Sequence, residues 1–169
     1  MKIITKDKID QVLDFMSYLG AKQYTEVMVK TAQRQPALAK YINQNSSYLS
    51  SDANNDGLYR MFVFTLMCYD DYGYDIPKIT EQQILKKTNE WQKIFNGNHL
   101  YLKIPVKIDF MRGMSKQLNL GLYYDTQIKG TKTTKPFFDE EDFSLAYLSM
   151  FVCNALLNDE IIKLQKEKK

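Results

Sequence analysis

The clearest chemical motif is a run of oxygen-bearing side chains at residues 52–57, Asp-Ala-Asn-Asn-Asp-Gly. Asp52, Asn54 and Asp56 stand at positions 1, 3 and 5 of the pattern that opens an EF-hand calcium loop. The twelfth position, where that loop needs a bidentate acid, is Val63. A metal site at these three residues is therefore one hypothesis. The incomplete motif favours the other, a polar turn whose Asp side chains cap the following helix.

Carboxylates gather in two further places, residues 70–75 and residues 139–142. Such clusters can hold Mg²⁺ for phosphodiester chemistry, because hard cations prefer oxygen ligands. Residues 139–142, however, precede a predicted helix, where negative charge stabilises the helix N-terminus. The acids of residues 70–75 surround a glycine turn. Structural roles are favoured for both clusters, and a carboxylate- and magnesium-dependent nuclease is the third function considered.

Nucleophilic catalysis has little support in the sequence. The single histidine, His99, stands in a polar turn, while Cys68 and Cys153 stand inside apolar helical runs without a basic neighbour that would lower a thiol pKa. We therefore name no catalytic residue, and the sequence favours a non-catalytic protein over an enzyme without deciding between them. The cysteines are typical of small core residues in a reducing compartment, which favours a cytoplasmic location. No glycine-rich phosphate loop is complete, so we expect no cofactor.

One segment is distinctly basic. Residues 98–137 carry seven basic and two acidic side chains, although the formal net charge of the chain is only +3. The basic residues could follow a phosphate backbone, and the tyrosines and phenylalanines between them could stack on unpaired bases. The alternative is a solvated hairpin face on which lysine protects an open edge. The basic residues of the segment are Lys103, Lys107, Arg112, Lys116, Lys129, Lys132 and Lys135.

The length of 169 residues suits one globular domain, residues 1–169, with a core large enough to need no disulfide or metal. Apolar side chains recur at helical spacing over most of the chain, and the first stripe contains Ile9, Val12, Leu13, Met16 and Leu19. The most apolar windows, near residues 61–69 and 145–157, are shorter than the roughly 20 residues of a membrane span. Helices are predicted at about residues 5–19, 22–34, 36–42, 58–72, 80–97 and from 139 to a Lys-rich tail, frayed over 162–169.

Two stretches depart from helical spacing. Residues 43–57 are polar and rich in Asn and Ser, which predicts a loop. Between residues 100 and 125 apolar and polar side chains alternate, which is the period of a strand. Pro105 argues against a helix interior there. The predicted fold is mainly α: a single-domain helical bundle of five to six helices with a short β-hairpin near 100–125, an all-α fold being the alternative.

These observations favour a non-catalytic protein–protein interaction module of the inhibitor, immunity, adaptor or regulatory type. Its expected partner is another protein, and we expect no membrane association. The alternative function is weak, sequence-independent nucleic-acid binding through residues 98–137. Specific base recognition is disfavoured, because only three of the 23 basic residues are arginines, the side chain suited to bidentate contacts.

Overall fold

The computed structural model describes residues 3–70, 75–97, 117–131, 133, 135–136, 138–139 and 142–167. Over these residues the chain forms helices and connecting segments, with no strand. The mainly α prediction is confirmed, in its all-α form for the part described. The helices are α1 (Lys6–Ser17), α2 (Ala21–Arg34), α3 (Pro36–Ser46), α4 (Asp52–Asp70), α5 (Glu81–Gly97), α7 (Leu118–Lys129) and α8 (Phe143–Glu167).

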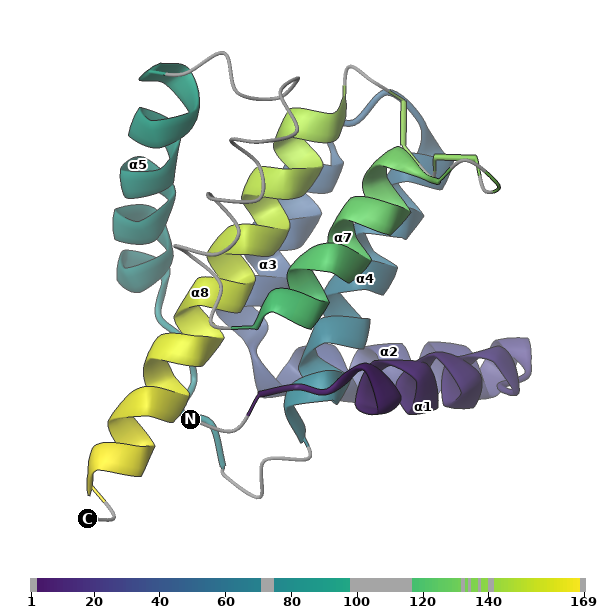
Figure 1. Ribbon diagram of the computed structural model, residues 1–169, viewed down its shortest axis with the longest axis horizontal. Helices are drawn as coiled ribbons and strands as arrows, with labels where there is room; N and C mark the ends of the chain where they lie inside the picture. Colours follow the sequence, from purple (N-terminus) through teal and green to yellow (C-terminus); the bar gives the residue numbers. More distant parts are fainter. Residues whose placement is uncertain are drawn as a thin grey trace.

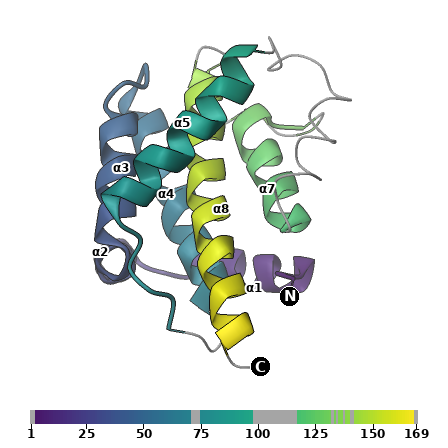
Figure 2. The ribbon, with the colours of Figure 1, turned by 90° about the vertical axis from the view of Figure 1, so that its left-hand side faces the viewer.

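The longest helix, α8, is the centre of the fold. It contacts α3, α4, α5 and α7 (Figures 1 and 2), and 14 of its 25 residues are buried. Apolar side chains on both faces of α8 are thus covered by helices on both sides. The helix remains regular to Glu167 and takes in residues 162–167 of the expected tail.

Helix α4 lies beside α8 and runs in the same direction. Polar contacts at two places align α4 with α8. Near the starts of the helices Asn54 donates to Asp142, and further along the Tyr69 hydroxyl donates to the Asn154 side-chain oxygen at 2.6 Å. Helix α7 runs the opposite way on α8. Its Tyr124 hydroxyl is buried and lies 2.8 Å from Thr65 Oγ1 of α4. These three hydrogen bonds join buried polar groups across helix pairs, which fixes the alignment of the helices.

Helices α1 and α2 cross the bundle instead of joining it. Both contact α4, and Figure 1 shows them extending sideways from its lower part, while Figure 2 shows them end-on. Only two side chains of α1, Ile9 and Val12, are buried. The chain before α1 is held by amides of α7: Ile4 N donates to Gln117 Oε1 at 2.7 Å, and Asn119 Nδ2 donates to Ile4 O at 2.8 Å.

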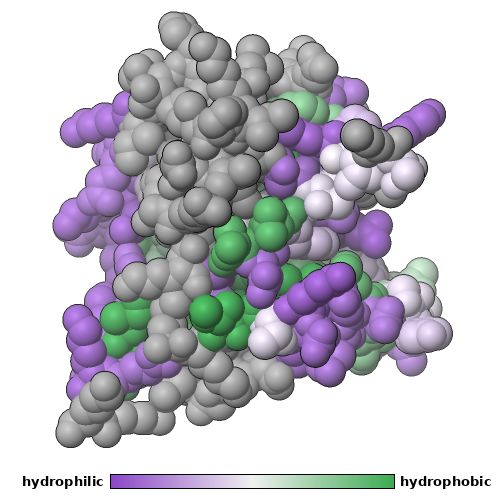
Figure 3. All heavy atoms as spheres, in the orientation of Figure 1, coloured by the Kyte–Doolittle hydropathy of each residue, from purple (hydrophilic) through white to green (hydrophobic). Residues whose placement is uncertain are grey.

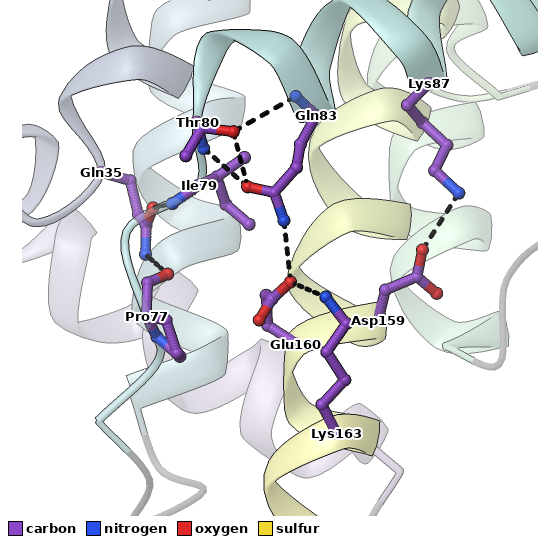
Figure 4. Close-up of polar contacts among 9 residues, drawn as sticks. All are labelled: Gln35, Pro77, Ile79, Thr80, Gln83, Lys87, Asp159, Glu160 and Lys163. Atoms are coloured by element: carbon purple, nitrogen blue, oxygen red, sulfur yellow. Dashed lines mark hydrogen bonds and ion pairs between the residues drawn. The ribbon is translucent and has the colours of Figure 1, made fainter.

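Helix α5 begins where its capping box predicts. Thr80 N donates to Gln83 Oε1 at 2.8 Å, and Gln83 N donates back to Thr80 Oγ1 (Figure 4). The same Gln83 donates through Nε2 to Glu160 of α8, which also accepts from Lys163. The cap is therefore part of the α5–α8 contact.

The segment before α5 is held by one buried amide. Gln35, which separates α2 from α3, accepts a hydrogen bond from Ile79 N at 2.9 Å and donates to Pro77 O at 3.1 Å (Figure 4). The exposed fraction of Gln35 is 3%. The Gln35 side chain thus makes hydrogen bonds to backbone groups of this extended segment that strand pairing or a helix would otherwise make.

The predicted hairpin is wrong where the structure describes it. Residues 118–129 form α7, and the preceding arm, residues 100–116, lies outside the described residues. Leu120, Tyr124 and Ile128 form a buried stripe at i, i+4 and i+8, while Leu118 and Leu122 are exposed. Because the exposed and the buried apolar residues of α7 are offset by two positions, an apolar side chain occurs at every second residue from 118 to 124. This spacing is that of a strand, which explains the error. With α7 included, the described residues contain seven helices instead of five to six.

The predicted loop at 43–57 is also wrong over most of its length. Helix α3 continues to Ser46 and α4 already begins at Asp52. The side chain of Ser51 accepts from Asn54 N at 3.2 Å, which caps the first turn of α4. Asp52 in that turn also favours the helix N-terminus. Cap-forming residues were thus mistaken for loop residues.

Candidate functional site

The three residues of the calcium hypothesis do not converge. Asp52, Asn54 and Asp56 lie in the first two turns of α4, where alternate residues point to different sides. Asp52 and Asp56 are exposed, whereas Asn54 is buried and donates to Asp142 Oδ2 at 2.5 Å. Helical residues spaced in this way do not form the curved oxygen cage of an EF-hand.

The two described acids of residues 139–142, Asp139 and Asp142, are engaged in structure. Asp142 is buried and accepts from Ser50 N at 3.0 Å and from Ser50 Oγ at 2.7 Å, in addition to Asn54. Asp139 accepts from Asn54 Nδ2 at 3.2 Å. The carboxylates of Asp139 and Asp142 thus join the connection between α3 and α4 to the start of α8. Within the described part of the chain, no three His, Cys, Asp or Glu side chains are grouped as metal ligands.

The cysteines are core residues, as the sequence indicated. Both are free thiols and fully buried. Burial raises the pKa of Cys68 to about 12 and also raises that of Cys153. Such thiols remain protonated and unreactive at neutral pH. His99 lies outside the described residues.

Only two of the seven basic residues of the segment are described. Lys135 is exposed. Lys129, at the end of α7, lies over the Tyr147 ring at 5.7 Å from its centre, and burial lowers the pKa of its ammonium group. Lys129 is therefore used within the fold. Lys103, Lys107, Arg112, Lys116 and Lys132 lie outside the described residues, so binding through the whole segment stays a prediction.

A groove between α1 and α7 is the best candidate for a binding site. Its floor is one face of α4, on which Gly57, Met61 and Phe64 follow at helical spacing. The groove has a volume of about 390 Å³. We call it the α1–α7 groove. Its lining residues are Leu13, Asp14, Met16, Ser17, Gly57, Arg60, Met61, Phe64, Tyr123 and Gln127.

The groove results from how its two walls are anchored. Helix α7 packs on α8 and α4 through Leu120, Tyr124 and Ile128, which leaves Tyr123 facing α1. Helix α1 uses Ile9 and Val12 against the core, which leaves Leu13 at the groove. Between these two contacts Met61 and Phe64 of α4 line the base of the groove and are almost fully buried.

The lining is apolar at its base and polar at its edges. The Phe64 and Tyr123 rings lie with centroids 4.2 Å apart. Burial raises the pKa of Tyr123, so its phenol stays neutral at physiological pH. Arg60 stands at the edge, with its guanidinium 5.3 Å from the centre of the Tyr24 ring. At the surface the groove offers the apolar side chain of Leu13 together with the polar side chains of Asp14, Ser17, Arg60 and Gln127.

Sequence reasoning missed this site because Leu13 was assigned to the buried stripe of the first helix. In the structure its exposed fraction is 36%. That stripe has five apolar residues, whereas α1 buries only two side chains, Ile9 and Val12. An apolar band wider than its helix partner can cover is the signal that was present in the sequence.

Comparison of the chain with protein-family models, with curated proteins and with solved structures found no match in any of the three. Among the described residues, one helix, α8, is long and apolar enough to cross a membrane by length and composition alone. Its most apolar window is 83% buried within the fold. A core helix of a soluble protein passes the same test, so α8 is weak evidence for a membrane span.

Proposed function

We propose that the chain is a non-catalytic module that binds another protein through the α1–α7 groove. The observation that carries the proposal is an apolar side chain, Leu13, that is 36% exposed at a groove of about 390 Å³. Apolar surface that a monomer leaves open beside polar residues is typical of interaction sites. Figure 3 shows hydrophobic atoms reaching the surface near α1 and α7 on this side of the molecule.

The surface of α1 adds to this picture. Phe15 is about half exposed, and Tyr18 is 85% exposed. Aromatic residues supply much of the binding energy at protein interfaces, because they bury large areas with few rotatable bonds. Their position on α1 makes this helix the side from which a bound partner would gain further contacts. Two buried free thiols support a reducing compartment, and we include a cytoplasmic location in the proposal.

The test compares Leu13→Gln with Leu85→Gln. Leu85 is an exposed leucine on α5 and is absent from the groove lining, so the second variant is a matched control. Glutamine is close to leucine in helix propensity, so both variants should fold. Partners are captured from native cell extract on each purified protein and quantified.

We expect at least one protein to be retained by the wild type and by Leu85→Gln, and to be lost with Leu13→Gln. If every retained protein binds all three chains equally, the groove is not the binding site and the proposal is wrong. Nucleic acid is tested on the same proteins, and we expect no retention of single or double strands at physiological salt.

A further inference from the structure

The extended segment before α5, residues 75–79, is hydrogen-bonded to the rest of the fold through one side chain. Gln35 Nε2 donates to Pro77 O at 3.1 Å, and Gln35 Oε1 accepts from Ile79 N at 2.9 Å (Figure 4). The same Nε2 lies 3.4 Å from Ile76 O. Within the described part of the chain, these five residues make no other hydrogen bond and no ion pair. We call this segment the 75–79 strap.

The 75–79 strap forms part of the lining of a cavity of about 330 Å³. Residues 75–78 line this cavity together with Leu66 and Tyr69 of α4 and Leu157 of α8. The exposed fractions of these three side chains are 5%, 0% and 0%. Gln35 also lines the cavity, so the side chain that holds the strap lies at the same place. Displacing the strap therefore removes one wall of the cavity and gives solvent access to its buried lining.

Little apolar surface opposes movement of the strap. Two of its side chains, Ile76 and Ile79, pack against the core, and the other three are exposed. Helix α4, by comparison, buries 11 of its 19 residues. Local opening is easiest where buried contacts and hydrogen bonds are few. The strap therefore opens at a smaller cost in free energy than the helices beside it.

The movement has a structural limit at Thr80. Thr80 N donates to Gln83 Oε1 and Gln83 N donates to Thr80 Oγ1, so the cap of α5 does not depend on Gln35 (Figure 4). Gln83 in turn donates to Glu160 of α8 at 2.9 Å. Helix α5 therefore stays capped and attached to α8 when the strap leaves Gln35.

We propose that the 75–79 strap is a movable cover, which opens while the helices stay folded, and that its hydrogen bonds to Gln35 set how often it opens. In the open state, solvent and molecules small enough for the cavity reach Leu66, Tyr69 and Leu157. The device is separate from the α1–α7 groove, since the cavity and the groove share no lining residue.

The first measurement is native-state hydrogen exchange of the wild-type chain, followed at single amides by NMR in urea below the unfolding transition. Opening of the strap exposes little surface, so exchange of the Ile79 amide should be almost independent of urea. Amides in the middle of α8 exchange through a much larger opening, and their exchange should accelerate steeply with urea. A common urea dependence of Ile79 and α8 would overturn the proposal, because the strap would then open only with the whole domain.

The second measurement uses a thiol in the lining of the cavity, introduced by Leu66→Cys. Labelling by iodoacetamide is located by mass spectrometry. Cys68 of the same helix is the internal control, because it is fully buried and its raised pKa keeps it protonated. Labelling at position 66 follows the open population of the strap, and we expect it to be at least about tenfold faster than at Cys68.

The role of Gln35 is tested by adding Gln35→Leu to Leu66→Cys. Loss of the amide should accelerate labelling at position 66 at least about tenfold and leave Cys68 unchanged. Gln33→Leu makes the same chemical change on an exposed side chain two residues earlier, and should change the labelling rate less than about twofold.

Equal effects of the two glutamine variants, or labelling at position 66 as slow as at Cys68, would contradict the proposal. So would an equal acceleration at position 66 and Cys68 in Gln35→Leu, because the substitution would then loosen the whole domain instead of the strap. The exchange of Ile79 is measured on the wild type and remains decisive if Gln35→Leu does not fold.

Discussion

The side-chain amide of Asn54 donates to the Asp142 carboxylate across the starts of α4 and α8, and both side chains are buried. The two residues are 88 positions apart in the chain. Because the same carboxylate accepts from the backbone and the hydroxyl of Ser50, one acid holds the α3–α4 connection, α4 and α8 together.

Replacing Asp142 by Ala should destabilise the fold by about 1–3 kcal/mol, because the buried Asn54 amide loses its closest acceptor. For a chain of this length each kcal/mol lowers Tm by about 2–4 °C. Asp139→Ala, which removes an exposed carboxylate with longer bonds, is the control and should have less than half the effect. Equal losses in chemical denaturation would show that Asp142 is not the centre of this contact.

The hydrogen bond between Thr65 and Tyr124 should respond unequally to removal of its two partners. In Tyr124→Phe the Thr65 hydroxyl still donates to Met61 O at 2.7 Å, so the loss should be about 0.5–1.5 kcal/mol. In Thr65→Val the fully buried Tyr124 hydroxyl loses its Thr65 partner, and we expect about 1–3 kcal/mol. Urea unfolding of the two variants measures the difference, and the reverse order would contradict this account.

Alkaline pH should destabilise the protein through its thiols. The ordinary pKa of a cysteine is 9.0, and burial raises that of Cys68 to about 12 in the folded chain. Above pH 9 the unfolded chain therefore loses protons that the folded chain retains, and stability falls by about 1.4 kcal/mol per pH unit for each such group. Below pH 9 both states keep the proton and this contribution is constant.

Cys153 shifts in the same direction, so two thiols act between pH 9 and 10, and the buried Tyr124 adds to them at higher pH. Unfolding free energies of the wild type and Cys68→Ala at pH 8, 9 and 10 check this prediction. The variant is expected to be less stable at pH 8, but to lose stability about half as steeply above pH 9. An unchanged slope would mean that Cys68 ionises in the folded state as freely as in the unfolded state.

Helix α1 should open more readily than the core helices α4 and α8. It buries two side chains along 12 residues, whereas α8 buries 14 along 25, and local opening follows the amount of buried contact. Hydrogen exchange should therefore be faster in α1 than in α4 and α8. Gln117→Ala, which removes the acceptor of Ile4 N, should accelerate exchange of residues 6–17 more than that of residues 81–93. Uniform acceleration would mean that α1 opens only with the whole domain.

The parts of the fold that follow from local pattern were predictable. The helix predicted at about residues 80–97 corresponds to α5, and the two most apolar windows of the sequence lie within α4 and α8, the helices with the most buried residues. Helix α7 was missed because its two apolar faces imitate strand alternation. The start of α4 was missed because Asn54, a polar residue, is buried by an acid far along the chain.

The candidate site was less predictable than the fold. Apart from Gly57, no residue of the α1–α7 groove belongs to a motif singled out in the sequence, and its apolar members have the spacing of ordinary core residues. Leu13 and Val12 are both apolar, but Val12 is buried against the core and Leu13 is 36% exposed. That depends on how far α7 lies from α1, a tertiary distance that helical periodicity does not encode.

The central position of α8 has a consequence for synthesis of the chain. It follows the other six described helices in sequence, yet α3, α4, α5 and α7 all contact it. A ribosome therefore releases four helices with apolar sides before the one that covers them. At about 5–20 residues per second the uncovered nascent chain persists for seconds, long enough for chaperones to bind it or for neighbouring nascent chains to aggregate. The core closes only when α8 has left the exit tunnel.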